Sequence, residues 1–265
     1  MVEKLIIGAI AGDIIGNEYA AEGRMPERPD LAALKARFTC NSVMTVAVMD
    51  SLLNGRDYTR NLQRYTKDFP GRGYGAAFLR WISQDDPKPY HSWNNGAALR
   101  VSPIGFAGRT LPEVVEEAAR CARVSHNHPD GVKGAEAVAA AVFLAKNGRS
   151  KKEIREHIEA DYGYDLSRTI EGISPGYYYD QSTQGSVPEA LLAFLDSNGF
   201  EHAMSLALSL GDKSGTITSI TGALAQAYYK EIPAYMVNPV VSRLTPEMYE
   251  IIEEFSKNWP LSLFH

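Results

Sequence analysis

Cysteine is scarce in this sequence, with Cys40 and Cys121 the only two among 265 residues. Two thiols are too few for the disulfide framework of small secreted domains, and such scarcity is typical of a reducing compartment. Long apolar runs are also lacking, because Asp13 interrupts the apolar opening segment 1–16 and no positively charged leader precedes it. We therefore expect a cytoplasmic protein without a membrane partner, in which segment 1–16 forms a buried core helix.

An excess of positive charge is absent as well. The chain has 27 lysine and arginine residues against 32 aspartate and glutamate residues, and its net charge is −5. The basic residues are scattered among the acidic ones, which gives no field to hold a phosphate backbone, so we expect no nucleic acid partner. With 45% hydrophobic residues the chain can bury a large core, and we expect one domain over residues 1–265.

The sequence shows no alternation of apolar and polar positions, no repeat of fixed period and no low-complexity linker, which argues against a β-sheet or a solenoid. Apolar residues instead recur three and four positions apart, as in packed amphipathic helices. The sequence thus predicts an all-α fold. Segments 135–146 and 216–229 are crowded with small residues, which let neighbouring backbones approach closely, so we expect helices there at the centre of a bundle.

The predicted helix ends are marked by residues that satisfy free backbone groups. Three pairs have the spacing of a capping box at a helix start, namely Thr110 with Glu113, Ser150 with Glu153, and Ser186 with Glu189. The Asn-Gly pairs at 147–148 and 198–199 tolerate the left-handed conformation that closes a helix, so each predicts a C-terminus. A Thr-Pro pair at 245–246 predicts the start of a last helix.

Four polar segments beside the predicted helices are the best candidates for a functional site, and they span residues 37–53, 89–105, 124–135 and 207–229. In the first segment, polar residues precede a helix whose free amides favour anions or oxygen acceptors, although Ser42 alone is most simply an N-cap. The fourth segment is a Gly/Asp/Lys/Ser turn that runs into a small-residue helix, so we expect it at the top of a central helix.

The second and third segments carry groups suited to a nucleotide. Backbone amides around Gly96 could reach diphosphate oxygens while the Trp93 indole stacks on a base or ribose, although a plain Asn-Asn-Gly turn explains the same residues. His126 and His128 are two positions apart, which is wrong for two ligands on one helix face, so a zinc site is not favoured. Neutral histidines that hydrogen-bond a ribose or phosphate, or a purely structural histidine, fit the segment better.

The sequence contains seven motifs in a fixed order, namely GDIIGNEY, FTCNSVMT, GYG, SWNNGAALRVSPIG, SHNHP, YDQSTQGSVPEAL and LGDKSGTI. Their order over residues 5–230 is similar to that of the ADP-ribosylglycohydrolase family. The resemblance implies a compact single-domain bundle of orthogonal α-helices with a central cleft. It further implies two magnesium ions and hydrolysis of the bond between ADP-ribose and its carrier, so the implied partner is an ADP-ribose-like small molecule or an ADP-ribosylated protein.

The resemblance also implies metal ligands in a TDDT run and a GGDxDT run, and both runs are changed here. The first reads Thr39, Cys40, Asn41 and Ser42, and the second reads Gly211, Asp212, Lys213, Ser214, Gly215 and Thr216. A thiol, an amide and an ammonium thus stand where a hard divalent cation needs carboxylates. We therefore expect no metal ligands and no magnesium. The Lys213 ammonium is either a substitute for part of the lost cation or a solvent-exposed group on a turn.

The catalytic half of the pattern is altered at a further position, because the carboxylate that contacts the ribose in the family corresponds to Ala20. Asp13 matches the GD pair of the pattern, and as an acid in a buried segment it needs hydrogen-bond partners, which favours a structural network over catalysis. The catalytic candidates that remain are Asp212 and Lys213, with Asp13 as the third.

The half of the pattern that holds the ligand is retained. The predicted ligand contacts are Thr39, Asn41, Gly73, Tyr74, Ser92, Trp93, Asn94, Asn95, Gly96, His126 and Thr216. Arg100 matches the pattern as well. Asn94 replaces a glycine of the pattern, so the backbone approaches a diphosphate less freely at this position.

Three functions are open at this point. The first is an ADP-ribosylglycohydrolase-like protein that binds ADP-ribose or a related nucleotide and hydrolyses its glycosidic bond without the usual two magnesium ions. The second is a catalytically inactive pseudoenzyme that binds ADP-ribose or an ADP-ribosylated partner, which the loss of ligands from both runs favours. The third is a structural domain without a ligand, against which the retained polar residues argue. The residues favour the first function narrowly.

Overall fold

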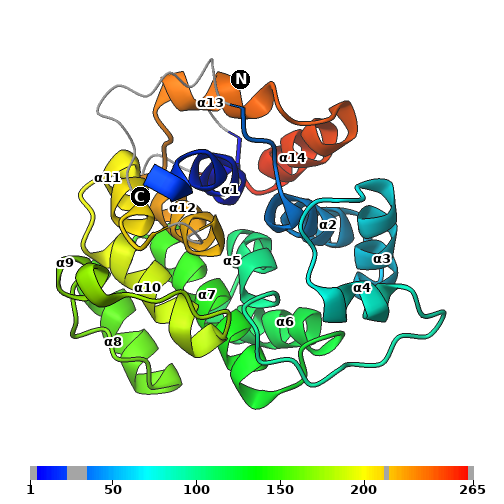
Figure 1. Cartoon of the computed structure of the whole chain (residues 1–265), viewed down its shortest axis with the longest axis horizontal. Coiled ribbons are helices and arrows are strands. Elements are labelled where there is room, and N and C mark those ends of the chain that lie inside the picture. The colour runs from blue at the N-terminus through cyan, green and yellow to red at the C-terminus, as the bar shows by residue number, and fades with distance from the viewer. Residues whose placement is uncertain (1–4, 23–34, 212–214, 262–265) are drawn as a thin grey trace.

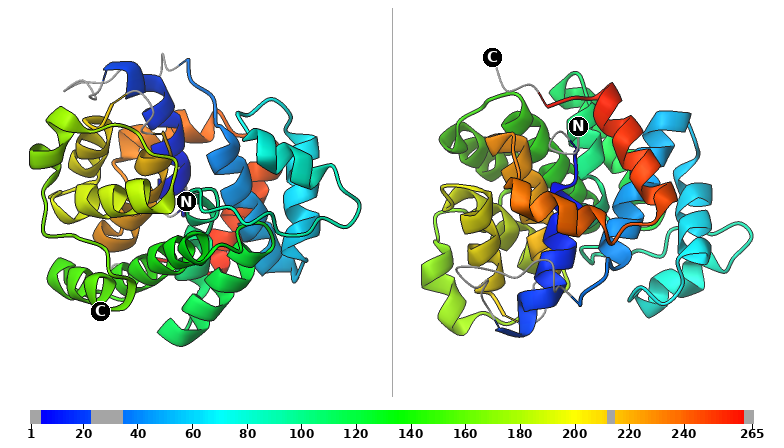
Figure 2. Two further views of the ribbon diagram at one scale, coloured as in Figure 1. Left: turned by 60° about the horizontal axis from the view of Figure 1, so that its bottom comes forward. Right: turned by 90° about the horizontal axis from the view of Figure 1, so that it is seen from above.

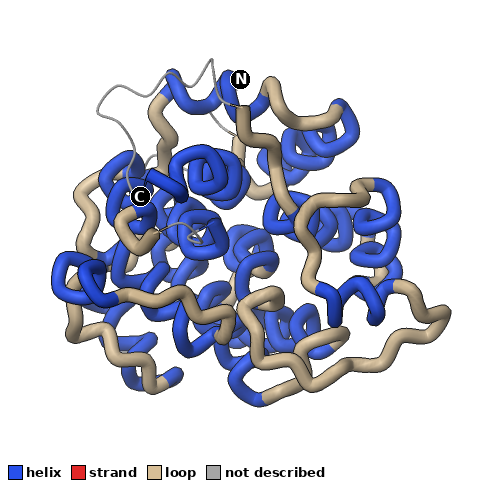
Figure 3. The backbone as a smooth tube through the Cα atoms, viewed as in Figure 1, coloured by secondary structure: helices blue, strands red, loops and turns tan. Residues whose placement is uncertain are grey.

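Helices make up all the regular secondary structure in the residues that the computed structural model describes, which are 5–22, 35–211 and 215–261. Within these ranges there is no β-strand, and one isolated bridge joins Asn94 to Ser182. The helices cross at varied angles around α1 and α12 (Figures 1 and 2), and loops connect them on the outside (Figure 3). The predicted all-α fold is confirmed.

The chain forms a succession of short and medium helices. The α-helices are α1 (Gly8–Tyr19), α2 (Cys40–Asn54), α3 (Tyr58–Asp68), α4 (Ala76–Ile82), α5 (Ser102–Ala107), α6 (Leu111–Arg123), α7 (Pro129–Lys146), α8 (Lys151–Tyr162), α9 (Ile170–Ile173), α10 (Thr183–Leu195), α11 (Phe200–Leu208), α12 (Gly215–Tyr229), α13 (Ala234–Val241) and α14 (Pro246–Asn258). Short 3-10 helices are η2 (Ala20–Glu22), η4 (Ala98–Arg100) and η5 (Ser174–Gly176). None of the helices in the described ranges combines the length and apolar character needed to cross a lipid bilayer.

Helices α1 and α12 pack backbone against backbone at the centre of the fold (Figure 1). On α1, glycine recurs at every fourth position, at Gly8, Gly12 and Gly16. A Cβ atom added at Gly12 would lie 2.1 Å from the carbonyl oxygen of Thr218, and one added at Gly222 would lie 2.2 Å from the carbonyl oxygen of Gly8. Because no carbon atom fits at such distances, only glycine allows the two backbones to touch.

A buried glutamine of α12 completes this contact. Gln226 Oε1 accepts hydrogen bonds from the amides of Ile7 at 3.0 Å and Gly8 at 2.6 Å, and its Nε2 donates to the carbonyl of Leu5 at 2.6 Å. Helix α1 has no side-chain cap of its own, so Gln226 satisfies amides that burial would otherwise leave unpaired. The predicted buried helix in the opening segment and the predicted central helix at 216–229 are both confirmed.

Helix α7 is the second central helix, and it is longer than the predicted segment 135–146. It begins at Pro129, whose fixed φ suits the first helical position. His128 caps this start by accepting a hydrogen bond from the amide of Asp130 at 3.1 Å. The small residues of α7 are buried against α5, α6 and α12. The run of small residues therefore marks the packed part of the helix, whereas the proline sets its beginning.

Most of the predicted helix ends agree with the structure. The confirmed ends are Thr110 before α6, Ser150 with Glu153 before α8, Thr245 before α14, and Asn147 with Gly148 after α7. At all four, a local residue supplies the polar group or the left-handed conformation that the helix end requires.

Two predicted helix ends are wrong. Ser186 lies inside α10, because Ser182 is the cap and accepts a hydrogen bond from the amide of Gly185 at 3.0 Å. The bridge between Ser182 and Asn94 holds this earlier serine in the extended conformation that a cap needs. Gly199 does not close α10, since its φ of −179° is extended and it stands at the N-cap position of α11.

The close contact between α1 and α12 predicts that one added methyl group strongly destabilises the fold. In Gly12→Ala the new Cβ meets the Thr218 carbonyl and pushes the two helices apart, so we expect the free energy of unfolding to fall by about 2 to 3 kcal/mol. Urea denaturation measures this change. Gly176→Ala is the matched control, because nothing lies within 4 Å of its added Cβ, and it should stay within about 0.5 kcal/mol of the wild type. Equal stability of Gly12→Ala and the wild type would contradict the backbone contact.

Candidate functional site

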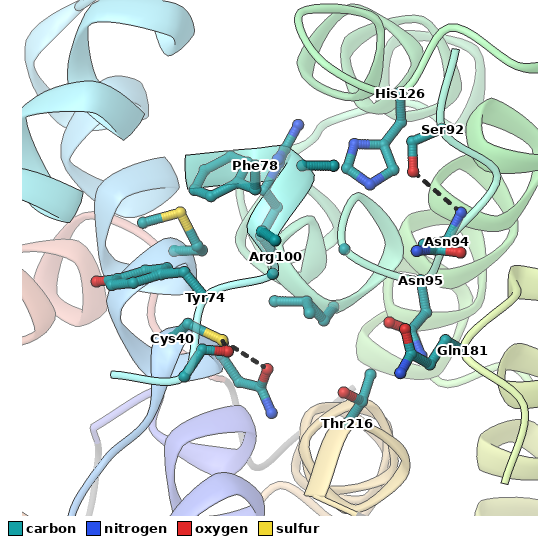
Figure 4. Close-up of a pocket in the computed structure, with 18 of the residues that line it drawn as sticks. Cys40, Tyr74, Phe78, Ser92, Asn94, Asn95, Arg100, His126, Gln181 and Thr216 are labelled. Atoms are coloured by element: carbon teal, nitrogen blue, oxygen red, sulfur yellow. Dashed lines mark hydrogen bonds between the residues drawn. The ribbon is translucent and has the colours of Figure 1, made fainter. Parts of the chain in front are cut away.

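A cavity of about 350 Å³ opens where the beginnings of α2 and α12 meet the loops that precede η4 and α10. Tyr74 and Phe78 form one wall, and Asn95 and Gln181 form the facing wall (Figure 4). Thr216 lies at one end of the cavity in the same view. The predicted contacts that line it are Asn41, Gly73, Tyr74, Ser92, Asn94, Asn95, Gly96, His126 and Thr216, and Arg100 lines it as well.

Some predicted site residues lie outside this wall. Trp93 is 53% exposed, and its ring contacts the ring of His128 with the centroids 5.8 Å apart. Thr39 lines a neighbouring cavity instead. Asp212 and Lys213 lie outside the described residues, so their roles stay predictions.

Several lining residues were not among the predicted contacts. Phe78 and Tyr90 add aromatic surface, and Tyr179 and Gln181 come from the loop before α10. The run of three tyrosines followed by Asp, Gln and Ser at 177–182 is the available signal, because such a polar aromatic run is unusual for a simple connector. Its place beside the cleft follows only from the tertiary structure.

The loop 92–96 is held by backbone pairing with the start of α10. The amide of Asn95 donates to the carbonyl of Gln181 at 2.8 Å, and the amide of Thr183 donates to the carbonyl of Trp93 at 3.1 Å. Within the loop, the amide of Asn94 donates to Ser92 Oγ at 3.2 Å. The loop is therefore preorganised, which reduces the entropy lost when a ligand binds.

His126 faces the cavity as a neutral imidazole. Burial and the nearby charge of Arg100 lower the pKa of His126 to about 3. Arg100 Nη2 donates to Ser125 Oγ at 2.9 Å, and Ser125 Oγ shares a hydrogen bond of 2.8 Å with His126 Nδ1. His126 Nε2 lies 3.0 Å from a Cβ position built at Gly96. The ring thus presents Nε2 beside the 92–96 loop.

Asp13 is fully buried and lines neither cavity. Its Oδ1 accepts from the Thr39 hydroxyl at 2.5 Å, and its Oδ2 accepts from the Thr39 amide at 2.7 Å and the Ser42 hydroxyl at 2.5 Å. Burial raises the pKa of Asp13 despite these bonds. The carboxyl group therefore ties α1 to the start of α2. The interpretation of Ser42 as the N-cap is wrong, because Thr39 occupies that position and Ser42 bonds Asp13 instead.

A second cavity of about 260 Å³ adjoins the first and is the place where the two altered metal runs meet. It shares Cys40, Asn41, Gly73 and Thr216 with the first cavity and adds Asn17, Ala20, Thr39, Arg72 and Gly215. No aspartate or glutamate is among these described residues. Since magnesium is held by several oxygen ligands that include carboxylates, this set of donors does not fit a binuclear magnesium centre.

The Cys40 thiol is a poor replacement for a metal-binding carboxylate. Burial and the negative charge of Asp13 raise the pKa of Cys40 to about 12, so the thiol stays protonated at neutral pH. Its Sγ lies 3.5 Å from the carbonyl oxygen of Gly73 and 3.7 Å from Asn41 Oδ1. A neutral thiol is neither a strong nucleophile nor a ligand for a hard cation.

Comparison with known proteins relates the whole chain to one family. The family model of ADP-ribosylglycohydrolase matches residues 2–261. The ADP-ribosylhydrolase ARH3 of Bos taurus is 27% identical over 84% of this chain and 83% of its own length. The ARH3 protein of Homo sapiens is 26% identical over 84% of both chains. The ADP-ribosylarginine hydrolase Tri1 of Pseudomonas putida is 28% identical over 57% of this chain and 42% of its own length.

A solved structure shares the fold. An ADP-ribosylglycohydrolase-related protein complex superimposes with a TM-score of 0.73, covering 96% of this chain and 95% of that chain. The sequence identity is 23%, so this likeness supports the arrangement of the helices and carries no conclusion about activity. The expected resemblance of fold is confirmed.

The low pKa of His126 predicts a pH-dependent stability. The pKa of His126 is about 3 in the folded protein and about 6.5 in the unfolded chain. Between these two values, the unfolded chain binds a proton at this residue and the folded chain does not. Stability from this group is present above about pH 6.5 and decreases as the pH falls toward about 3. Between about pH 7.5 and 4.5, wild type should lose about 2 to 3 kcal/mol more than His126→Asn in urea titrations. Parallel losses in the two proteins would contradict a buried neutral His126.

Proposed function

Because the chain belongs to the ADP-ribosylglycohydrolase family, we propose that its cleft binds ADP-ribose, a related nucleotide or the ADP-ribosyl group of a modified protein, without binuclear magnesium. This proposal rests on a contrast between two kinds of residues in the cleft. The loop 92–96 and His126, which match the ligand-holding half of the family pattern, border the first cavity, whereas no described acidic residue lines either cavity. Among the described residues that line the cleft, groups for binding are therefore present and carboxyl groups for acid and base catalysis are not.

The binding mode follows from the donors in the cavity. The neutral His126 imidazole and the Ser92 hydroxyl are hydrogen-bonding groups suited to a ribose or a phosphate. The buried Arg100 guanidinium adds a positive charge at the cavity wall, which favours a diphosphate. Outside the wall, the exposed indole of Trp93 offers a flat surface for an adenine ring. These groups together suit a nucleotide with a diphosphate link.

Occupancy of the cleft, rather than hydrolysis, is the function that this arrangement supports best. Glycosidic hydrolysis commonly uses a carboxylic acid to protonate the leaving group and a carboxylate to activate water or attack. Asp13 is the family carboxyl that the chain retains, and its oxygens are engaged by Thr39 and Ser42 away from the cavities. The retained donors can hold a nucleotide without these groups. A pseudoenzyme that binds ADP-ribose or an ADP-ribosylated partner is thus the first candidate.

A hydrolase without magnesium is the second candidate, and one observation favours it. The second altered run contains one carboxylate, Asp212, out of register with the aspartates of the family pattern and three positions before Gly215, which lines the second cavity. In this reading Asp212 is the general base and Lys213 stabilises developing negative charge. The activity named for the ARH3 and Tri1 relatives agrees with such a role.

Two properties of the whole protein complete the proposal. A single domain over residues 1–265 and a cytoplasmic location are both in keeping with a chain that has two cysteines and a large buried core. We further propose that the partner is a nucleotide or an ADP-ribosylated protein, and not a nucleic acid or a membrane.

Titration calorimetry with ADP-ribose tests the binding proposal. We expect a dissociation constant on the order of micromolar that magnesium leaves unchanged. Trp93→Ala should weaken binding about tenfold, because base stacking on an aromatic side chain contributes about 1 to 3 kcal/mol. Tyr235→Ala is the matched control, since Tyr235 is an aromatic residue on α13 that is 46% exposed and lines neither cavity. Tighter binding with magnesium would refute the metal argument, and no binding would refute the proposed ligand.

A product assay separates the two candidates. Purified protein is incubated with an ADP-ribosylated peptide, and free ADP-ribose is measured by chromatography. For a pseudoenzyme we expect no product above the uncatalysed rate. Product formation that disappears in Asp212→Asn would instead establish the hydrolase, and full turnover in Asp212→Asn would remove that residue from the mechanism.

A further inference from the structure

We propose that the place where the two cavities meet is an anion subsite, formed by Asn41, Arg72, Gly215 and Thr216, that takes a phosphate group on the terminal ribose of an ADP-ribose-like ligand. This inference rests on the proposed function, because the ligand that carries the phosphate is the one assigned to the cleft. It places an anion where the family pattern has magnesium, so the sign of the bound charge is reversed.

The described residues that line the cleft carry only positive charge, although the chain has a net charge of −5. Arg72 and Arg100 are the charged side chains among the described residues that line the two cavities, and no acidic residue balances them there. Arg100 is 1% exposed, and its Nε has no hydrogen-bond partner in the described ranges. A buried cation without a neighbouring carboxylate is costly unless an anion binds beside it.

Two nearly buried side chains direct unused polar groups at the subsite. Asn41 is 6% exposed and lines both cavities, and no residue in the described ranges hydrogen-bonds its Nδ2. Thr216 is 9% exposed, lines both cavities, and its hydroxyl has no partner within those ranges. Figure 4 shows the Thr216 side chain reaching from α12 into the pocket. Because buried polar groups are nearly always paired, these donors indicate a ligand with several acceptor oxygens.

The beginning of α12 adds a favourable dipole. This helix of 15 residues starts at Gly215, which lines the second cavity, and its N-terminal end carries a partial positive charge. A Cβ added at Gly215 would meet only Asn41 Nδ2, at 4.0 Å, so the backbone here is open to a close approach. Backbone amides at an accessible helix start bind phosphate oxygens well, and Asn41 and Thr216 stand beside them.

Arg72 is held where its charge can act on the same anion. Its guanidinium lies over the Phe38 ring, 4.0 Å from the centroid, and its Nη1 donates to the Phe38 carbonyl at 3.4 Å. Its other N–H groups make no hydrogen bond to the described part of the chain, so they can donate to an anion. A cation stacked on an aromatic ring loses less side-chain freedom when it binds a phosphate than a mobile surface arginine does.

The acidic and thiol groups that the structure describes close to the subsite oppose an anion only weakly. Asp13 and Glu18 belong to α1 but line neither cavity. Asp13 accepts hydrogen bonds from Thr39 and Ser42, and Glu18 Oε2 accepts from the amides at 35 and 36, so each carboxylate faces its own donors. Cys40 lines both cavities as a neutral thiol, because burial raises its pKa.

The position of the subsite defines which part of the ligand it binds. In Figure 4, His126 and Thr216 lie at opposite ends of the pocket. A nucleotide whose diphosphate is held near His126 and the 92–96 loop extends its terminal ribose toward Thr216. A phosphate on that ribose then meets the Asn41, Arg72 and Thr216 donors. The cleft therefore selects a phosphorylated terminal ribose over a free one.

Calorimetry with three probes tests this selection, with a chelator present throughout. The probes are ADP-ribose, ADP-ribose that carries a phosphate on C1 of its terminal ribose, and inorganic phosphate. We expect the phosphorylated nucleotide to bind about tenfold or more tightly than ADP-ribose, because charge-assisted hydrogen bonds are the strong ones. Asn41→Asp should abolish this preference by placing a negative charge in the subsite. Asn198→Asp adds the same charge on an exposed loop and should preserve it.

The possible results separate this inference from the proposed function. Equal binding of both nucleotides overturns the subsite and leaves the proposed function intact. Binding of inorganic phosphate that Asn41→Asp abolishes, without binding of either nucleotide, supports the subsite and overturns the proposed nucleotide. No binding of any probe overturns both. Thr216→Val keeps the side-chain shape and should reduce the preference for the phosphorylated nucleotide several-fold. This variant tests the subsite if Asn41→Asp does not fold.

Discussion

The contact between the backbones of α1 and α12 determines where every group of the cleft lies. Glycines on both helices bring the two axes closer than any other residue permits, and Gln226 seals the start of α1. From α1, Asp13 reaches the start of α2 and fixes Thr39. The start of α12 then lies beside the start of α2, so that Asn41 and Thr216 line the same cavities. A small change in the central contact would therefore alter the whole cleft.

A second set of constraints positions the ligand-holding side of the cleft. The loop 92–96 is paired with the backbone before α10, and the buried guanidinium of Arg100 orders Ser125 and His126. Arg100 donates to Ser125, and Ser125 is hydrogen-bonded to His126 Nδ1, so the imidazole is held with Nε2 beside the loop. The pocket thus combines a rigid loop with a fixed imidazole ring. Such preorganisation favours tight binding even without catalysis.

The two halves of the cleft have diverged from the family pattern to different extents. The half that matches the ligand-holding part of the pattern keeps its residues except at Asn94, whereas the half that carries metal ligands in the pattern now has Cys40, Asn41, Lys213 and Gly215. These changes replace negative charge by neutral or positive groups, and the two arginines that line the cavities act in the same direction. A coordinated change of this kind is what a new ligand requires, since loss of one ligand alone would leave an unbalanced metal site. These changes are the basis for the anion subsite proposed above.

The sequence by itself determined the all-α class, most helix ends and the chemistry of the altered runs, because these depend on residues close together in the chain. Capping residues, prolines and apolar spacing act within one or two helical turns. Only the tertiary structure decided which polar residues share the cleft. In the folded chain Ser182, and not Ser186, caps α10. Asn95 donates a hydrogen bond to Tyr179, which is 84 positions away in the sequence, and Trp93 is exposed. The physical reason is that such contacts depend on how helices far apart in the sequence pack against each other, and no pattern of neighbouring residues specifies that packing.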